Sequence, residues 1–439
     1  MTARTDGRLL DVVRLDSPRG RERVAALTAR GGAVLDAELT RRAAEIVERV
    51  RSEGDAALVD CVRRYDGGTA ATAAGLRLPT PELGAARAAA PAGFAAALET
   101  AVEAVEAFHR RQVHAGFATS EGGVELVERR RPLARVGVYV PGGLASYPST
   151  VVMTVVPARL AGVAEVAVAT PPGSYAANAA LRYALARLGV GEVWGMGGAH
   201  AVAAFAYGTE TVPRVDKIVG PGNAWVTAAK KRVAGDVGID GLAGPTEVVV
   251  VAEAAAADAA WVAADLLAQA EHDRRAAAIL VTDDEAFAHA VEAELAAQLP
   301  ALASAATARA SLTASGTAFV VDDVEAALPL VEAYAPEHLQ LVGRRAEALA
   351  GRVSSAGAIF LGATTPEVFG DYLAGPSHVL PTGGSARFAS ALGVEDFVRR
   401  SHTVRFSAAA ARRLAAAAAA LADAEGLPAH AAAARRRLP

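Results

Sequence analysis

Short runs of β-branched and other apolar residues alternate along this chain with longer, alanine-rich stretches of helical spacing. Runs without interspersed polar residues are typical of strands buried on both faces of a parallel sheet, and a strand–helix rhythm predicts βα units. The pattern therefore predicts the α/β fold class. The predicted strands are Val136–Val140, Val166–Val168, Val193–Trp194, Ile218–Val219, Val248–Val251, Ile279–Thr282, Phe319–Val321 and Ile359–Leu361.

Helices are predicted at both ends of this pattern. From Asp36 to Val50, apolar residues recur at the spacing of one helical face, and Asp36 is placed as an N-cap. Beyond about Gly393 the strand signal stops, and Ser407–Ala424 consists mostly of alanine, the residue with the best helix propensity. We therefore expect a helical C-terminal segment.

Turn clusters follow several of the predicted strands. Pro141–Gly143, Gly195–Gly198 and Gly220–Gly222 are candidate binding loops, because ligands of open α/β sheets bind beyond the carboxyl ends of strands. Gly220–Ala224 and Ala243–Glu247 also fit ordinary tight turns, although their glycines would let a ligand approach the backbone. The chain has no Gly-x-Gly-x-x-Gly fingerprint, so spacing alone does not predict a dinucleotide site.

Length and charge narrow the function. A chain of 439 residues predicts roughly three folding units. Its net charge of -4, from 44 basic and 48 acidic side chains, creates no field that would attract nucleic acid or anionic lipid. Apolar stretches end before the roughly 18 residues of a membrane span, and Met1–Leu10 lacks the apolar core of a secretory signal. We expect a small-molecule substrate, with no nucleic-acid or membrane partner.

Cys61 is the only cysteine, which excludes an internal disulfide, a thiolate zinc cluster and an iron–sulfur site. A reducing cytoplasm fits this composition. Any metal must take its ligands from histidine, carboxylate or amide side chains. Four of the nine histidines stand in polar, Gly- or Pro-marked contexts: His272, His338, His378 and His430.

Two of these histidines have a polar neighbour at a suggestive spacing. Gln269 and His272 lie at i, i+3 near the end of the predicted helix Trp261–Asp273, so both side chains share one face. Glu337 and His338 follow Pro336, and an imidazole with a pKa near 6.5 is a natural acceptor for an alcohol proton. Taken alone, each pair also fits an ordinary surface position.

The other two histidines lie in segments expected to be irregular. Asp371 and His378 stand among small residues in Gly370–Gly384, which has neither helical nor strand periodicity, and such loops often present site residues. His430 is expected in a turn, because Gly426 can end the alanine helix and Pro428 stiffens the exit. A structural turn and a surface histidine are the alternative interpretations.

Seven motifs, in order, resemble those of the histidinol dehydrogenase family, and the likeness runs from about Val136 to the C-terminus, with weaker helical similarity before it. Coincidence of seven colinear motifs is very improbable. The motifs are Val136–Gly143, Gly220–Asn223, Ala243–Glu247, Ala268–Asp273, Ala335–Leu339, the Gly-Asp-Tyr to His-Val-Leu-Pro-Thr stretch within Gly370–Gly384, and Ala424–His430.

The resemblance implies one Zn²⁺ per subunit, held by Gln269, His272, Asp371 and His430, with His430 supplied by the partner in a homodimer. Such a nitrogen and oxygen ligand set leaves positions for the amino and imidazole nitrogens of histidinol. The ion would orient the substrate without changing oxidation state, and hydride would pass to NAD.

Roles for other residues follow from the same resemblance. His338 would be the general base, and Glu337 would activate the water that adds to the aldehyde-level intermediate. For the cofactor, the family pattern maps onto Tyr139, His200 and Asn223, although many members have Gln where this chain has His200. Substrate contacts would be Thr246, Gln269, His272, His338, Asp371, His378, Glu425 and His430, with Glu425 also from the partner.

The resemblance further implies two related Rossmann-like parallel-sheet domains in an intertwined homodimer. We expect an N-terminal helical segment at 1–33, and a first α/β domain from 34–138 and 248–392. A second, NAD-binding α/β domain is expected at 139–247, and a C-terminal helical segment that contacts the partner at 393–439.

Two other functions fit parts of these data. A related zinc- and NAD-dependent dehydrogenase of the same fold could act on another small alcohol, such as a sulfonated diol, but Glu425 and His430 match the pair that would recognise the amino and imidazole groups. A non-catalytic dimeric binding protein would not need Glu337 and His338. The sequence therefore favours oxidation of L-histidinol to L-histidine, the last steps of histidine biosynthesis.

Overall fold

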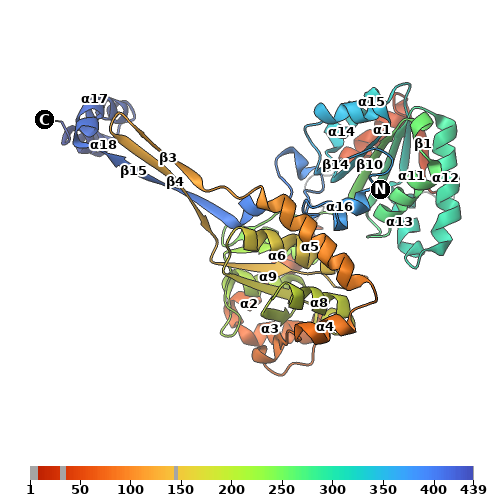
Figure 1. The fold of residues 1–439 in the computed structure, drawn as a ribbon, viewed down its shortest axis with the longest axis horizontal. Helices are drawn as coiled ribbons and strands as arrows, with labels where there is room; N and C mark the ends of the chain where they lie inside the picture. Colours follow the sequence, from red (N-terminus) through yellow and green to blue (C-terminus); the bar gives the residue numbers. More distant parts are fainter. Residues whose placement is uncertain (1–7, 30–35, 143–146, 439) are drawn as a thin grey trace.

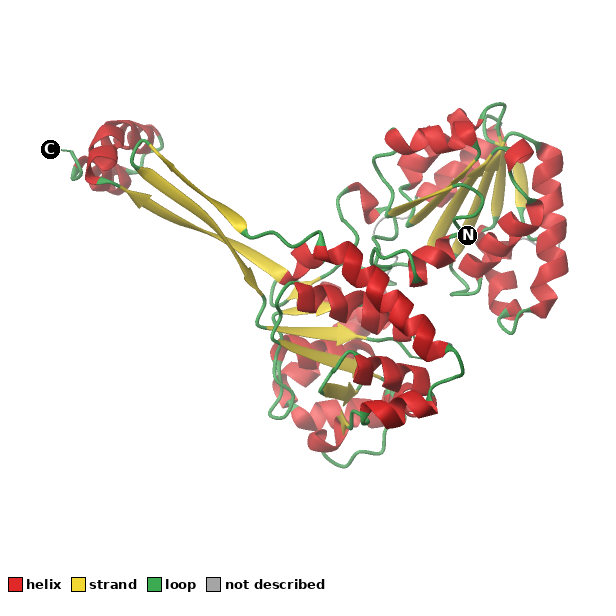
Figure 2. Ribbon diagram, in the orientation of Figure 1, coloured by secondary structure: helices red, strands yellow, loops and turns green. Residues whose placement is uncertain are grey.

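The computed structural model describes residues 8–29, 36–142 and 147–438. Within these ranges the strands form two six-stranded sheets and one three-stranded sheet. Helices cover both faces of each six-stranded sheet, and the three-stranded sheet forms a long arm that carries helices α17 and α18 at its tip (Figures 1 and 2). In this part of the chain, no helix is both long and apolar enough to span a membrane.

The first six-stranded sheet, which we call sheet 1, is parallel throughout and has the order β1-β12-β11-β10-β13-β14. One face packs against α11, α12 and α13, and the other against α1, α14 and α15. Its strands are β1 (Asp11–Arg14), β10 (Glu247–Ala252), β11 (Ala277–Thr282), β12 (Thr317–Val320), β13 (His338–Val342) and β14 (Ala358–Leu361). Its helices are α1 (Pro18–Thr28), α11 (Ala259–Ala270), α12 (Glu285–Gln298), α13 (Ala305–Ser315), α14 (Leu328–Tyr334) and α15 (Arg344–Glu347).

Sheet 2 has the order β2-β7-β6-β5-β8-β9 and is parallel except for the edge strand β2. Its strands are β2 (Arg77–Leu78), β5 (Arg135–Tyr139), β6 (Glu165–Thr170), β7 (Glu192–Gly195), β8 (Lys217–Val219) and β9 (Gly238–Ile239). One face packs on α2 (Ala37–Glu53), α3 (Asp55–Tyr65), α9 (Gly198–Tyr207) and α10 (Ala224–Val233). The other packs on α4 (Leu83–Ala89), α5 (Phe94–Arg110), α6 (Pro148–Leu160), α7 (Pro172–Ala177) and α8 (Ala179–Arg187).

The two sheets share one topology. In each, three consecutive strands run toward one edge and the next two run toward the other, so the strand order reverses between β10 and β13 and between β5 and β8. This is the doubly wound arrangement of Rossmann-like domains, in which the reversal marks a crevice at the carboxyl ends of the strands. The predicted α/β fold with two related parallel sheets is confirmed, and each of the eight predicted strands lies in one of them.

The helices and strands before residue 139 are distributed between the two sheets differently from the expected domain division. Residues before 34 contain a strand as well as a helix, because β1 pairs with β12 in sheet 1. Helices α2 and α3 pack on sheet 2, where Val47 and Leu58 share a core with Trp194, rather than on the sheet formed by residues 248–392. Amphipathic spacing predicts that a helix packs on something, but does not identify which of two similar sheets it covers.

The arm corrects the expectation that strands stop beyond about Gly393. Strand β15 (Val398–Phe406) pairs antiparallel with β4 (Val124–Pro132), which pairs in turn with β3 (Gly116–Glu121). Nearly every residue of β15 is exposed, so the strand has no buried face and lacks the hydrophobic alternation that predicts strands.

Two short helices also replace predicted irregular segments. Helix α17 (Ala408–Ala424), capped by Ser407, confirms the expected C-terminal helix, but α18 (Pro428–Arg435) places His430 in a helix rather than a turn. Proline is well suited to the first helical position, where its missing N–H is not needed. Asp371 likewise lies in a helix, α16 (Glu367–Tyr372), which is too short to show a period in the sequence.

Candidate functional site between the two sheets

The predicted catalytic pair lies at the amino end of β13 in sheet 1, next to the amino end of the neighbouring strand β10. Thr246 immediately precedes β10, while Glu337 and His338 lie where β13 begins. The left-handed backbone of Ala335 (φ 49°) at the end of α14 turns the chain into this strand. Gln269, at the end of α11, also contacts this group. Four residues from three separate segments are thus brought together.

Glu337 is 7% exposed, and backbone and side-chain groups hold its carboxyl. Its Oε2 accepts hydrogen bonds from Thr246 Oγ1 (2.5 Å) and from Glu247 N (3.0 Å). Burial raises the pKa of Glu337 above its ordinary value, although His338 and Thr246 act in the opposite direction. A carboxyl whose pKa is shifted toward neutrality is suited to accept a proton from water.

His338 is 4% exposed and has a defined orientation. Its Nδ1 donates to Glu247 O (3.1 Å), while Nε2 lies 3.7 Å from Asp371 Oδ1. A backbone acceptor at Nδ1 fixes the tautomer that leaves Nε2 as the basic nitrogen. Burial alone would lower the pKa of His338, but the carboxylates of Glu337 and Asp371 outweigh it and raise the pKa to about 9.

Glu367, a buried carboxyl on α16, was not among the predicted site residues. With its nitrogen turned toward this carboxyl, the Gln269 amide donates to Glu367 Oε2 (2.8 Å). Burial raises the pKa of Glu367 well above its ordinary value. Only its position one helical turn before Asp371 could have indicated it.

Two further predicted residues tie the site to sheet 2. His378 Nδ1 donates to Asp371 O (3.1 Å), and its Nε2 lies 3.4 Å from Thr150 Oγ1 on α6. The imidazole of His272 stacks on the Tyr147 ring at the start of α6, with 6.4 Å between the ring centroids and planes 18° apart. The candidate site therefore lies between the two sheets.

The expected zinc ligands come only partly together in one chain. Within residues 8–29, 36–142 and 147–438, no group of three or more His, Cys, Asp or Glu side chains is arranged to hold a metal. Asp371 lies beside the catalytic pair and has a lowered pKa, because contacts with His338 outweigh its burial. Glu425 and His430 are exposed at the tip of the arm, away from this group (Figure 1). The amide, imidazole and carboxylate donors fit Zn²⁺ chemically, but the set is incomplete without another chain.

The predicted cofactor residues lie at the opposite, carboxyl edge of sheet 2, around the strand reversal between β5 and β8. Tyr139 ends β5, and its hydroxyl accepts from Gly198 N (3.1 Å). Burial raises the pKa of Tyr139 to about 12. Asn223 caps α10 and accepts from Trp225 N (3.0 Å), so its side chain is part of the helix start. His200 lies in the first turn of α9.

A buried ion pair that was not predicted holds the loop before Asn223. Lys230 Nζ donates to Gly220 O (2.6 Å) and to Asp240 Oδ1 (2.6 Å), while Asp240 Oδ2 accepts from Gly220 N (2.7 Å). Both side chains are almost fully buried. Gly220 has φ +109°, and a Cβ there would lie 2.2 Å from Tyr139 O, so only glycine fits. Lys230 is 3% exposed in the middle of α10, and no pattern in the sequence marked it as buried.

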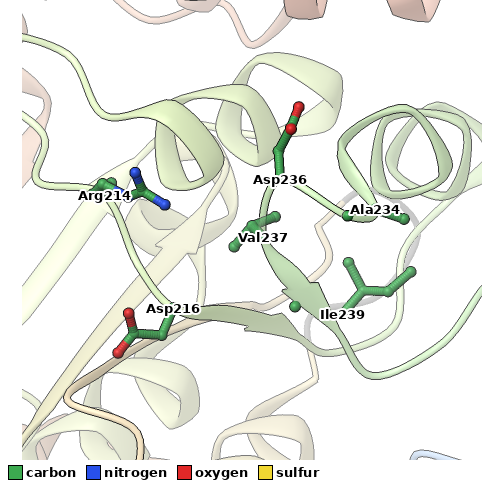
Figure 3. Close-up of a pocket in the computed structure, with 8 residues that line it drawn as sticks. Arg214, Asp216, Ala234, Asp236, Val237 and Ile239 are labelled. Carbon is green, nitrogen blue, oxygen red and sulfur yellow. The ribbon is translucent and has the colours of Figure 1, made fainter. Parts of the chain in front are cut away.

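A surface hollow of about 410 Å³ lies elsewhere, at the amino end of β8 (Figure 3). It is lined by Arg214, Asp216 and Asp236 among others, and by none of the predicted site residues. Asp216 Oδ2 already accepts from Ala134 N (2.9 Å) and Arg135 N (3.2 Å), which gives this carboxylate a structural role. The predicted cofactor residues and this hollow therefore lie at different edges of sheet 2.

The fold consists of two doubly wound sheets, and a buried carboxylate–imidazole pair lies between them. Glycine-containing turns held by hydrogen bonds lie at the strand reversal of sheet 2. These features define an α/β enzyme with its site between domains. The sequence profile described as histidinol dehydrogenase matches residues 31–438. The chain belongs to the histidinol dehydrogenase family, whose members are NAD-dependent oxidoreductases.

Individual relatives agree with this assignment. Histidinol dehydrogenase of Caulobacter vibrioides is 49% identical over 404 residues, 92% of this chain and 93% of the relative. That of Rhizobium meliloti is 47% identical over 97% of both chains. The crystal structure of histidinol dehydrogenase from Elizabethkingia anophelis superposes with a TM-score of 0.89 at 32% identity, covering 98% of each chain.

Proposed function

We propose that this chain oxidises L-histidinol through L-histidinal to L-histidine, passing one hydride to NAD⁺ in each of two steps. Family membership supports the substrate and cofactor. The observation that carries the chemistry is the orientation of His338: in the neutral imidazole, Nδ1 donates to Glu247 O, so Nε2 is the nitrogen that accepts a proton. We expect the enzyme to work in the cytoplasm, as befits a chain whose single cysteine is buried and free.

In the first step, His338 Nε2 removes the hydroxyl proton of the alcohol as hydride leaves the adjacent carbon for the nicotinamide. Glu337 then takes a proton from the water that adds to the aldehyde, which produces the hydrate from which the second hydride leaves. Thr246 and Glu247 N hold the Glu337 carboxyl in place throughout. Tyr139, His200 and Asn223 frame the cofactor at the carboxyl edge of sheet 2.

Zinc fits this proposal through the donors that would hold it: Gln269, His272, Asp371 and His430 of the partner subunit. When bound, such an ion would supply a fixed positive centre, which the amino and imidazole nitrogens of the substrate chelate and which thereby orients the substrate. His378 donates to the backbone carbonyl of Asp371 and so fixes the main chain that carries this carboxylate. Glu425 of the partner subunit would face the substrate amino group.

The shared site requires a homodimer, and the arm supports one. The arm projects from the rest of the chain and carries Glu425 and His430 at its tip (Figure 1). Large apolar side chains on the arm and tip are exposed, among them Phe117, Val404, Phe406 and Leu421, the last at 69%. Exposed apolar groups concentrated on one projecting element are typical of an interface with another chain.

The direct test measures stoichiometry. Zinc-loaded protein supplied with limiting L-histidinol and excess NAD⁺ should form two NADH for each histidine produced. One NADH per substrate would limit the enzyme to alcohol oxidation, and no turnover with histidinol but turnover with a sulfonated diol would favour the related dehydrogenase. Binding of histidinol without formation of NADH or histidine would favour the binding protein.

A second test addresses the shared site. His338→Asn and His430→Ala chains are each expected to be inactive, but mixed dimers should contain one intact site. Random exchange of equal amounts should restore about a quarter of wild-type activity, because half of the dimers are mixed and each has one working site of two. Absence of recovery after subunit exchange has been verified would place all site residues within one chain.

A further inference from the structure

The turn Gly195–Gly198, which leads into α9, is held by side chains from two other elements. Asp66, at the end of α3, accepts with Oδ2 from Gly197 N (2.7 Å) and from His200 Nε2 (2.8 Å). On the neighbouring residue, Gly198 N donates to the Tyr139 hydroxyl (3.1 Å). The N–H groups of Gly197 and Gly198 are therefore bonded within the protein.

His200 is directed toward Asp66. The residue is 1% exposed, and its ring lies 6.2 Å from that of Tyr65, with planes 31° apart. The Asp66 side chain is 9% exposed. A buried carboxylate without a donor is costly, so the imidazole N–H of His200 holds Asp66 in the position from which it binds Gly197 N.

The turn is also closely packed against Asp66. A Cβ on Gly197 would lie 2.9 Å from Asp66 Oδ1, so the carboxylate packs directly on the backbone it binds. The carboxylate also lies at the N-terminus of α9, where the helix dipole favours a negative charge. This N-terminus is usually where such folds bind a phosphate, and here a side chain of the protein occupies it.

We propose that His200 is a positioning residue: through Asp66 it holds the Gly195–Gly198 turn beside Tyr139, and it does not itself touch the dinucleotide. This inference rests on the proposed use of NAD, and it refines how His200 serves that cofactor. It also explains why an imidazole can stand where many family members have Gln, since either side chain can donate a hydrogen bond to Asp66.

A double-mutant cycle on NADH affinity tests this role. NADH is titrated into the purified dimer, by its fluorescence, for wild type, Asp66→Ala, His200→Ala and the double variant. Each single variant should weaken binding by about tenfold, which corresponds to about 1.4 kcal/mol. If His200 acts only through Asp66, the double variant should bind no more weakly than Asp66→Ala. An undiminished effect of His200→Ala in the Asp66→Ala background would show direct contact and overturn the proposal.

Steady-state kinetics add a readout that simple destabilisation would not move. The KM for NAD⁺ should rise in both single variants, while the KM for histidinol and the first-step kcat stay within about twofold of wild type. His200→Gln retains a donor and should restore NADH affinity to within about twofold. Equal losses of affinity in His200→Gln and His200→Ala would overturn the role assigned to the hydrogen bond.

A matched control is available in the same half of the molecule. His109 is also fully buried, and its Nδ1 bonds Gln112 Oε1 (2.8 Å) at the end of α5. His109→Ala should lower the unfolding midpoint as much as His200→Ala does, but leave NADH affinity unchanged; an equal loss of affinity would overturn the proposal. If the alanine variants do not fold, Asp66→Asn and His200→Phe provide the same cycle, because phenylalanine keeps a ring of similar size and removes the N–H donor. Failure of wild type to bind NADH would instead refute the proposed function.

Discussion

The two six-stranded sheets share a topology but use opposite edges. In sheet 2, Tyr139 and the turns that contain Gly198 and Gly220 lie at the carboxyl ends of the strands, near the strand reversal between β5 and β8. Hydrogen bonds from Gly198 N and Gly220 N to side chains hold both turns. In sheet 1 the corresponding edge is filled by ion pairs. Arg345, at the start of α15, binds Glu253 (3.0 Å), Asp283 (2.7 Å) and Asp323 (3.3 Å), which follow β10, β11 and β12.

This difference shows what topology decides and what side chains decide. The doubly wound order creates a crevice at the carboxyl edge of each sheet, but a guanidinium and its carboxylates occupy the one in sheet 1. The proposed catalytic groups lie instead at the amino edge of sheet 1, where Thr246, Glu337 and His338 meet. In the proposed function, two copies of one architecture thus divide the cofactor and the chemistry between them.

The largest effect is expected from the amino edge of sheet 1. His338→Asn should lower kcat for histidinol oxidation by about 10²–10⁴-fold, the usual contribution of a general base, while NADH affinity is retained because its loops lie in sheet 2. Steady-state rates and NADH titration measure both. If the variant lost NADH affinity together with kcat, the cofactor residues and the catalytic residues would not act separately in the two sheets.

Glu337→Gln should separate the two oxidation steps. The variant is expected to slow histidinal oxidation by about 10²-fold and histidinol oxidation much less, because only the second step needs a base for water. Single-turnover rates from each substrate provide the comparison. Equal losses in both steps would mean that Glu337 supports His338 rather than activates water.

A smaller effect is expected at the carboxyl edge of sheet 2. Lys230→Met removes the buried cation that holds Gly220 O and leaves Asp240 unpaired. The KM for NAD⁺ should rise by about tenfold while the KM for histidinol is unchanged. Because an unpaired buried charge also destabilises the fold, by about 3–5 kcal/mol, denaturant unfolding should be measured alongside.

Arg345→Met is the matched control for that change, since it removes a cation at the equivalent edge of sheet 1. Arg345 is partly exposed, so we expect a loss of stability of about 1 kcal/mol or less and no change in the KM for NAD⁺. A rise in that KM equal to the one in Lys230→Met would contradict separate roles for the two carboxyl edges.

The stability of the metal-free protein should also depend on pH. The folded-state pKa of His338 is about 9, above its ordinary 6.5, because Glu337 and Asp371 outweigh burial. A raised pKa contributes stability that is fully present below pH 6.5 and is lost as pH rises through about 9. Urea unfolding across this window should show the loss, and His338→Asn should reduce it; identical pH profiles would falsify the assignment.

The sequence predicted those parts of the fold that bury a regular pattern. Runs such as Val248–Val251 are apolar at every position because helices cover both faces, and such runs can be identified without neighbours. Strand β15 could not be identified this way, since it has no buried face. The hydrophobic pattern also could not predict which sheet α2 covers, because its apolar stripe fits either one.

At the site, family motifs located the residues whose side chains face one another, such as Glu337 and Thr246. They did not locate the residues that hold those groups in place. Asp66 lies 131 positions from Gly197, and its role depends on a contact that only the folded chain makes. Lys230 and Asp240 gave too weak a signal, because a charged residue in a helix is ordinarily solvated.

The tip of the arm has a further consequence. Its own core consists of Ala419, Ala422 and Ala431, side chains too small to order two helices by themselves. If the tip docks on a second chain, its folding and that docking become one equilibrium. Specific activity should then fall on dilution and recover on concentration, so that protein abundance itself sets the fraction of working sites.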